Sequence, residues 1–315
     1  MGAYLVRRIL AFIPTLLISV TLIFILTRLV PGNPVWALVG HQSVSEEKIK
    51  EVSHELGLDR PVLVQYLTWL PKALSGDFGS SIFFNRPVVA VIADRFPVTL
   101  TLAGLAMLLT LALAIPLGIF AATRQNSLVD HATSVFSTLG VSLPSFWLGF
   151  LLIILFAVTL HWFPSSGYRP LSMGIVPWLS RLVLPVIALA LSQVALLVRT
   201  TRSSMLEVLG MEYVTAARAK GLSEAKVIYK HALRNAFISI ITVIGLTFAL
   251  SLGGSVIIEN VFAIPGLGQL ITTAAIRRDY PVIEGGMMYL TVISLAVNLL
   301  VDISYTLINP RVVYE

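Results

Sequence analysis

Long apolar stretches separated by short polar intervals dominate the sequence. Six of them hold enough apolar residues, roughly 20, to cross the hydrocarbon core of a bilayer as a helix. Each must be helical, because lipid offers no hydrogen-bond partner to an unpaired backbone group. The pattern therefore predicts an all-α integral membrane protein with six transmembrane helices. The predicted spans are 9–30, 98–122, 134–160, 182–200, 237–258 and 285–308.

The interval after the first span is long enough to form helices of its own. Ser43 and Glu46 have the spacing of a capping box and predict a helix that ends at Gly57. Pro61 starts a second helix, which a turn in the sequence GDFG ends. Its apolar side consists of Leu63, Leu67, Leu70 and Leu74. This loop is either a packed cap on the bundle or a docking surface for an external partner.

The apolar pattern divides the chain into four parts. They are 1–30 (N-terminal end and first span), 31–97 (loop subdomain), 98–308 (five-span core containing the polar segment 201–236) and 309–315 (C-terminus). Lys and Arg gather in the cytoplasmic loops of membrane proteins. With the N-terminus inside, the cytoplasmic segments carry eleven Lys and Arg, and the short outer loops carry four. We therefore expect both termini and the polar segment in the cytoplasm.

Composition narrows the possible functions. The chain is 57% hydrophobic and only 12% charged, against about a quarter charged in ordinary domains. Its net charge of +6 suits a protein that faces an anionic lipid leaflet. No soluble domain is present on which a nucleic acid could bind. The absence of Cys excludes disulfides, iron–sulfur clusters and thiolate metal sites.

The central portions of the spans contain no Asp, Glu, Lys, Arg or His. Ion-coupled carriers usually place such residues there, so their absence argues against a secondary carrier. The five His are scattered along the chain, and no nucleophile, zinc or P-loop motif is present. We therefore expect no enzyme activity of its own, no cofactor and no metal site. If transport is driven, its energy must come from another polypeptide.

Residues 212–236, EYVTAARAKGLSEAKVIYKHALRNA, form a basic patch between the fourth and fifth spans. Small helix formers predict a helix from Glu212 to Lys220, which Gly221 ends. Ser223 is a predicted N-cap of a second helix, which runs into the fifth span. One interpretation is a loop that only fixes orientation through its charge. The other is a slim helix that docks in a groove of a partner protein.

Small residues recur every four positions in the second and fifth spans, and they favour close helix packing or a pore-lining face. They are Ala114, Gly118 and Ala122 in the second span and Gly245, Ala249 and Gly253 in the fifth. Pro116, Pro144 and Pro185 should kink the spans that contain them.

Eight motifs occur in order along nearly the whole chain. They are YLVRRIL…IPTLL, LVPGNP, GLDRPVLVQY with its following GDFG, SLPSFWLGF, ARAKGLS…HALRNA, GGSVIIENVFAIPGLG, RDYPVI and NLLVDISYTLINPRV. Together they resemble the dipeptide, oligopeptide, nickel and glutathione permeases among the importer-type ABC transporters. The resemblance implies a type I ABC importer permease fold with a helical extracytoplasmic loop. Asn33 and Asn309 stand where the family has Asp, and Ser239 stands where Pro is common.

The resemblance also implies that 201–236 is a coupling loop, called the EAA loop, whose short helix sits in a cleft of a cytoplasmic ATPase subunit. Thr215, Ala216 and Ala217 occupy the three positions that name it. Thr215 replaces the acidic residue, and Leu233-Arg234 replaces the closing Leu-Pro, as is usual in the peptide branch. The implied coupling residues are Glu212, Tyr213, Thr215, Ala216, Ala217, Arg218, Lys220, Gly221, Leu222 and Ser223.

The implied partners are a second homologous permease, two ABC ATPases and an extracytoplasmic solute-binding protein, in a bacterial cytoplasmic membrane. The expected cargo is a di- or oligopeptide. The alternatives are a nickel chelate or glutathione carried by the same machinery and, from another class, an ion-coupled secondary carrier.

Overall fold

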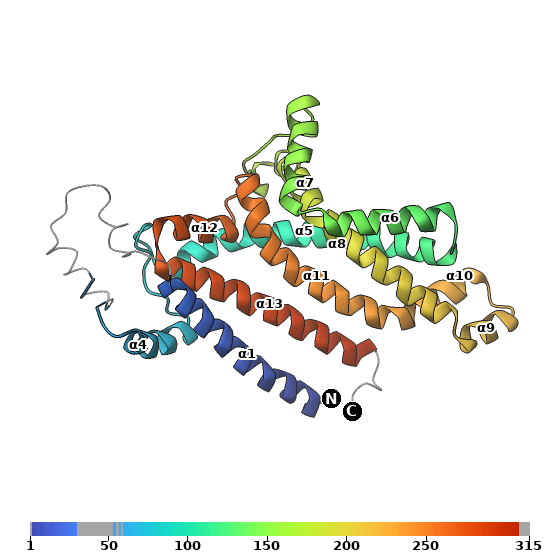
Figure 1. Cartoon of the computed structure of the whole chain (residues 1–315), viewed down its shortest axis with the longest axis horizontal. Coiled ribbons are helices and arrows are strands. Elements are labelled where there is room, and N and C mark those ends of the chain that lie inside the picture. The colour runs from blue at the N-terminus through green and yellow to red at the C-terminus, as the bar shows by residue number, and fades with distance from the viewer. Residues whose placement is uncertain (1, 30–52, 55–56, 58, 309–315) are drawn as a thin grey trace.

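The computed structural model describes residues 2–29, 53–54, 57 and 59–308, with the backbone alone for 2–9 and 305–308. Most of this chain is helical (Figure 1). The α-helices are α1 (Gly2–Leu29), α4 (Val62–Leu74), α5 (Val88–Thr123), α6 (Leu128–Ser142), α7 (Ser145–Leu152), α8 (Ile175–Leu209), α9 (Glu212–Ala219), α10 (Glu224–Lys226), α11 (Leu233–Val261), α12 (Leu267–Arg277) and α13 (Tyr280–Ile308). Two π-helical segments, η1 (Ile153–Thr159) and η3 (Val227–Ala232), and a 3-10 turn, η2 (Leu171–Met173), complete the set.

Five helical segments in the described part of the chain are long and apolar enough to cross a membrane, and a bent pair makes a sixth. This confirms the prediction of a helical membrane protein. The helices extend beyond most of the predicted spans, because hydropathy marks only their apolar middles. One consequence is that the predicted boundary at 97/98 falls inside α5, which begins at Val88.

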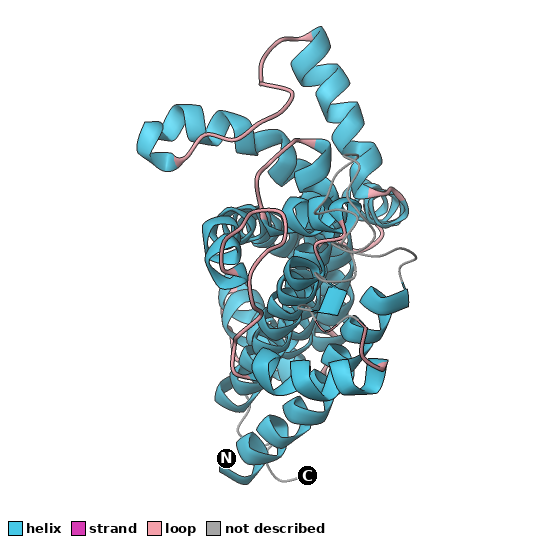
Figure 2. Cartoon of the chain, turned by 90° about the vertical axis from the view of Figure 1, so that its left-hand side faces the viewer, coloured by secondary structure: helices cyan, strands magenta, loops and turns pink. Residues whose placement is uncertain are grey.

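The predicted span over 134–160 is sharply bent, and Pro144, where a kink is predicted, stands between its two parts. α6 begins at Leu128, and it meets the helix formed by α7 and η1 at an angle of 102°. The reason is Pro144, which lacks a backbone N–H and holds Leu143 in an extended conformation. α7 and η1 therefore project from the bundle (Figures 1 and 2). The helices that contain Pro116 and Pro185 continue past both residues.

The core of the bundle is the pairing of α5 with α8, the most extensive helix contact in the structure. A Cβ added at Gly118 would lie 2.5 Å from the Cβ of Thr201, so only glycine permits this approach. Ala114 and Ala122 on the same face are fully or almost fully buried. The small residues of the second span therefore form a packing face, as one of the two interpretations predicts.

In the described part of the outer loop, helix α4 packs on α1. Ala73 is buried, and Trp69 and Tyr66 contact Phe24 of α1. The predicted leucine stripe does not make this contact, because three of its four members are exposed: Leu63, Leu67 and Leu74. Gly76 and Gly79 have φ of 84° and 72°, which confirms the predicted turn. The start of the helix predicted after Ser43, and the substitutions at Asn33 and Asn309, lie outside the described residues; the described end of that helix includes helical Ser53 and His54, and Gly57 has a φ of 66°.

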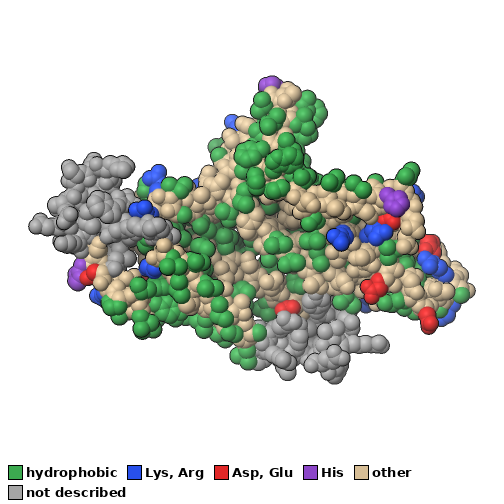
Figure 3. Space-filling model, in the orientation of Figure 1, with side chains coloured by type: hydrophobic (Ala, Val, Ile, Leu, Met, Phe, Trp, Pro, Cys, Tyr) green, Lys and Arg blue, Asp and Glu red, His purple; other side chains and the backbone are tan. Residues whose placement is uncertain are grey.

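The long helices give the molecule two ends (Figure 1). α9 and α10 lie at one end, here called the α9 end, and α4 and α12 lie at the opposite end. α1 begins and α13 ends toward the α9 end. On the face shown in Figure 3, charged side chains gather toward these two ends, with mainly apolar and other uncharged surface between them.

Candidate functional site

α9 is the short helix that the sequence predicts between the fourth and fifth spans. Its last residue is Ala219, and Gly221, two residues later, has a φ of 74° in the left-handed region. The Gly221 N–H donates to the Arg218 carbonyl at 2.9 Å, and the Leu222 N–H donates to the Ala217 carbonyl at 3.4 Å. These two bonds form the Schellman end that glycine favours, so the predicted helix stop is confirmed.

α9 has a buried face and an exposed face. Val214 and Ala217 pack against the helical core. Thr215, Ala216 and Ala219 are exposed, so a strip of small side chains faces outward. The structure thus divides the three naming positions between two faces, with Ala217 turned inward. Of the other predicted coupling residues, Leu222 is half-buried and the rest are exposed: Glu212, Tyr213, Arg218, Lys220, Gly221 and Ser223.

A second helix begins after the glycine and continues through η3 into α11, as predicted. Ser223 occupies the N-cap position, but the predicted side-chain cap is absent. The first turn of this helix is held by a backbone hydrogen bond, in which the Ser223 carbonyl accepts from the Val227 N–H at 3.0 Å. Arg218 donates to Glu224 at 2.6 Å and 3.2 Å. This hydrogen-bonded pair ties α9 to α10, and it raises the pKa of Arg218.

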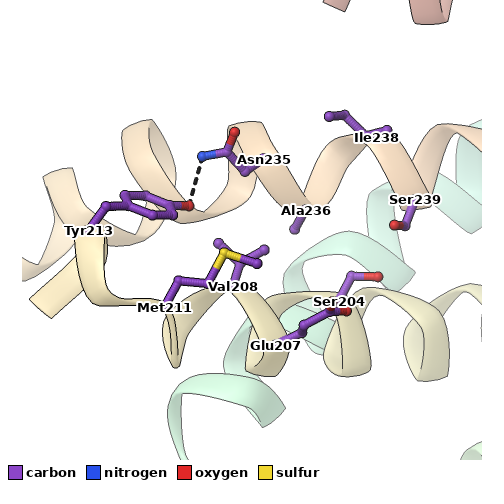
Figure 4. Close-up of a pocket in the computed structure, with 9 residues that line it drawn as sticks. All are labelled: Ser204, Glu207, Val208, Met211, Tyr213, Asn235, Ala236, Ile238 and Ser239. Carbon is purple, nitrogen blue, oxygen red and sulfur yellow. Dashed lines mark hydrogen bonds between the residues drawn. The ribbon is translucent and has the colours of Figure 1, made fainter. Parts of the chain in front are cut away.

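An open cavity of about 500 Å³ lies beside α9, between the end of α8 and the start of α11 (Figure 4). Asn235 of α11 donates through Nδ2 to the hydroxyl of Tyr213 at 2.7 Å and to the His231 carbonyl at 3.0 Å. Glu207 of α8 lines the cavity on the other side. Because three segments contribute to this cavity, its shape depends on where α9 holds α8 relative to α11.

A buried ion pair fixes α6 to α8 at the same end. Asp130 is 2% exposed and accepts two hydrogen bonds from the Arg202 guanidinium, one of them at 2.8 Å. Asp130 also accepts from the Asn126 N–H at 3.0 Å. The turn between α5 and α6 is therefore held against the helix that leads into α9.

A second buried carboxylate, Glu259, joins α11 to α12 near the opposite end of the bundle. It accepts from the Thr99 hydroxyl at 2.6 Å and from the Gln269 N–H at 3.0 Å. Gln269 lies in the first turn of α12, where unpaired N–H groups favour an anion. Gly266 and Gly268 make room for it, because a Cβ at Gly266 would lie 2.3 Å from the Glu259 carboxyl carbon.

Two further buried carboxylates fix the start of α13. Glu284 accepts from Arg28 of α1 at 2.7 Å, and Arg28 also donates to Gln65 of α4 at 3.0 Å. Asp279 accepts from the Ser81 hydroxyl at 2.5 Å and from two backbone N–H groups beside it. These contacts join α1, α4, α13 and the chain before α5 into one end of the bundle.

Sequence reasoning missed these four carboxylates as structural residues. Each stands at the edge of an apolar stretch, where an acidic residue usually faces water. The one visible signal is the pair Gly266 and Gly268 after Glu259 in GGSVIIENVFAIPGLG. Two glycines at a helix start indicate close approach by another group, but they do not say which group approaches.

The small residues of the fifth span have different surroundings. A Cβ at Gly245 would lie 2.3 Å from a methyl of Val301, so this glycine packs against α13. Ala249 is half-buried. Gly253 is exposed, with nothing within 4 Å of an added Cβ. Close packing therefore explains Gly245 and leaves Gly253 facing open space.

The described residues contain no group of three or more His, Cys, Asp or Glu that could hold a metal ion. What the arrangement offers is mechanical. α9 follows directly on α8 and leads into α11, so a displacement of α9 moves the ends of two long helices.

Two family models match the chain. Residues 114–314 match the binding-protein-dependent transport system inner membrane component, and residues 1–103 match the N-terminal part of such membrane components. A putative peptide transport system permease protein of Brucella abortus is 45% identical over 315 residues and the full length of both chains. The oligopeptide transport permease AppB of Bacillus subtilis and the di/tripeptide transport permease DppB of Pseudomonas aeruginosa are 39% and 38% identical, again over the full length of both chains.

Solved structures show the same fold. A chain of the MetNI methionine ABC transporter, in an inward-facing conformation, superposes with a TM-score of 0.57 and 17% identity. The match covers 70% of this chain and 96% of that one.

Proposed function

The chain belongs to the family of binding-protein-dependent transport system inner membrane components and is thus a permease subunit of an ABC importer; we propose that α9 couples it to an ATPase and that its cargo is a peptide. The observation that carries the coupling role is the exposed strip of Thr215, Ala216 and Ala219. A helix with such small side chains can enter a cleft that a bulkier helix cannot.

The connections of α9 explain how a pull on it reaches the membrane. α8 ends at Leu209 and α9 begins at Glu212, so two residues separate them. On the other side, the Arg218–Glu224 pair joins α9 to the helix that continues into α11. Closure of two ATPases on ATP would therefore shift α8 and α11 together, and the bundle would change between inward-open and outward-open arrangements.

The partners follow from the same premise. We propose that a second homologous permease completes the path across the membrane and that two ATPase subunits bind at the α9 end. An external solute-binding protein delivers cargo at the opposite end, where α4 and α12 lie. This orientation places both termini in the cytoplasm, and it agrees with the Lys and Arg distribution of the loops.

A peptide is the cargo best supported, because full-length relatives carry the names of peptide, oligopeptide and di/tripeptide permeases. A nickel chelate or glutathione carried by the same machinery is the alternative. A chelated ion would need no protein ligands in the path.

The coupling role predicts a specific defect for Ala216→Trp. The indole would stand on the exposed face of α9 and block its entry into an ATPase cleft. We expect ATP-driven uptake of labelled trialanine by the assembled importer to fall roughly tenfold or more, the scale of a lost interface hot spot. The ATPase subunits should also copurify less with the permease.

The matched control is Ala132→Trp, which alters another exposed alanine, on α6 at the same end. It should leave uptake and copurification near the unmodified level. Normal uptake and normal ATPase recovery with Ala216→Trp would contradict coupling through α9. A loss with both variants would indicate a general effect of added bulk.

A further inference from the structure

A seam between α6–α7 and α8, which α11 also borders at one of its two cavities, is not used by the coupling role. The first, about 220 Å³, is lined by Ser134, Ser137, Thr138, Arg199 and Arg202. The second, about 270 Å³, is lined by four polar residues, Ser145, Ser192, Gln193 and Thr247, and by Val141, Leu189, Leu196, Leu250 and Gly254. The four polar side chains are uncharged, and the charged residues among the two cavity linings, Arg199 and Arg202, line the first cavity.

The cavities follow one another along the same helix faces. On α8, Gln193, Leu196 and Arg199 recur every three residues and so lie on one side. Leu196 lines the second cavity and Arg199 the first. Gln193 is the nineteenth of the 35 residues of α8. At 1.5 Å per residue, the polar lining runs about 9 Å from Arg199 to the middle of the helix.

Two buried polar atoms on this seam have no hydrogen-bond partner in the described structure: Ser137 Oγ and Gln193 Oε1. Ser137 is 2% exposed and Gln193 is 6% exposed. Gln193 Nε2 donates to the Leu189 carbonyl at 3.0 Å, which identifies the other amide atom as the free acceptor. Leaving a buried polar group unpaired is unfavourable, so these positions favour a ligand that can hydrogen-bond.

One positive charge on the seam is uncompensated. Arg202 is neutralised by Asp130. Arg199 is exposed, and none of the ion pairs in the described chain involves it. The seam therefore has hydrogen-bonding groups near the middle of α8 and an anion-attracting group toward the α9 end.

We infer that this seam is the wall that the chain contributes to the solute path, and that it recognises a peptide by its amide and carboxylate groups. Gln193 accepts from an amide N–H of the cargo, and the Ser and Thr hydroxyls donate to its carbonyls. Arg199 draws the terminal carboxylate toward the α9 end. The inference rests on the proposed function and names the residues that contact the cargo.

A phospholipid headgroup accounts for only part of this arrangement. Its phosphate would pair with Arg199 and Ser137 near the membrane surface. Gln193 and Ser192 lie near the middle of α8, a helix long and apolar enough to span a membrane, so the proposed function puts them beside acyl chains, which carry no hydrogen-bonding groups. Amide and hydroxyl groups this deep fit a polar solute that passes through.

Cysteine accessibility tests the inference, because the chain has no Cys of its own. Ser192→Cys and Thr138→Cys are made singly in the assembled importer in membrane vesicles. Leu108→Cys, at a 64% exposed leucine in the middle of α5, is the control for lipid exposure. The probes are two membrane-impermeant methanethiosulfonates, the anionic sulfonatoethyl and the cationic trimethylammonioethyl reagent.

We expect both seam cysteines to react and Leu108→Cys to stay unreactive, because the thiol ionises only where water reaches it. The anionic reagent should react about tenfold faster than the cationic one at Thr138→Cys, through attraction to Arg199. Arg199→Gln should remove that preference. Excess trialanine, with the binding protein and ATP present, should slow labelling of Ser192→Cys.

Each other outcome is decisive. Ser192→Cys as unreactive as Leu108→Cys overturns the inference. Labelling confined to Thr138→Cys identifies a headgroup or free-anion site and also overturns it. If trialanine is taken up but protects neither cysteine, the peptide does not pass this seam. If both cysteines react but trialanine is not transported at all, the proposed peptide cargo fails and the aqueous path remains supported.

Discussion

At the residue scale, Glu259 shows how a charge is accommodated beside apolar helices. Its carboxylate is fully buried, and its hydrogen bonds come from Thr99 and from the first turn of α12. An unpaired carboxylate at this position would be strongly destabilising. Gly266 and Gly268 are required because their missing side chains leave room for α11 and its carboxylate. Neither glycine has a positive φ, so these positions require glycine for its small size and not for its backbone conformation.

Gly268→Ala should therefore destabilise the protein. Its Cβ would lie 2.4 Å from Val256 Cα, a backbone atom of α11 that cannot rotate away. We expect a loss of about 1–3 kcal/mol, the usual range for overpacking. The measurement is the thermal unfolding midpoint of the detergent-purified protein.

Gly253→Ala is the control for this substitution. An added Cβ there meets nothing within 4 Å, and the residue lies inside α11. Alanine in a helix interior is favoured over glycine by about 0.5–1 kcal/mol, so the midpoint should be unchanged or higher. Equal midpoints for Gly268→Ala and the unmodified protein would disprove the spatial requirement.

At the element scale, the break between α9 and α10 separates α9, the proposed coupling helix, from the fifth span. Gly221 reverses the chain with a left-handed φ, and nothing lies within 4 Å of an added Cβ. A side chain there would be opposed by the backbone conformation and not by neighbours. Glycine is therefore needed at this position because of the backbone conformation of the turn.

Gly221→Val tests the importance of that turn. A β-branched residue disfavours this φ by about 1–2 kcal/mol, so the end of α9 should change its path. We expect ATP-driven trialanine uptake to be lost while insertion and the unfolding midpoint stay near normal. Gly210→Val, at a right-handed φ of −81° in the turn before α9, should retain uptake. Full uptake with Gly221→Val would show that the turn is dispensable.

At the scale of the whole molecule, the two ends of the bundle have different chemistry. The α9 end presents a slim helix, its hydrogen-bonded turn and one buried carboxylate, Asp130, whereas three buried carboxylates, Glu259, Asp279 and Glu284, lie toward the opposite end. The proposed coupling requires this difference, because the α9 end would have to move with an ATPase while the rest of the bundle stays intact. The Arg28–Glu284 and Asp279 contacts supply the rigid part.

The proposed orientation predicts which side of the membrane a reagent must be on to reach a given residue. Ser223→Cys, between α9 and α10, and Ser165→Cys, in the loop after η1, both replace exposed serines. In intact cells a membrane-impermeant maleimide should label Ser165→Cys and spare Ser223→Cys. In inverted vesicles the pattern should reverse. Labelling of both from the same side would show that the orientation or the number of crossings is wrong.

The sequence by itself determined the helical membrane class, the position of the spans, the stop at Gly221 and the continuation into the fifth span. These depend on local properties: the length of each apolar stretch, the need to pair every backbone group within the helix, and the ease with which glycine adopts a left-handed φ. The same reasoning predicted a kink at Pro144, but it also predicted kinks at Pro116 and Pro185, past which α5 and α8 continue.

Only the tertiary structure decided how sharply the chain turns at Pro144, which face of α4 is buried and which partners Glu259, Asp279 and Asp130 find. It also decided that Gly245 packs on α13 while Gly253 stays open, although both follow the same four-residue pattern. The physical reason is that a hydrogen bond or a close contact between distant segments depends on both partners. The sequence pattern of one segment describes that segment alone and carries no information about the partner it will contact.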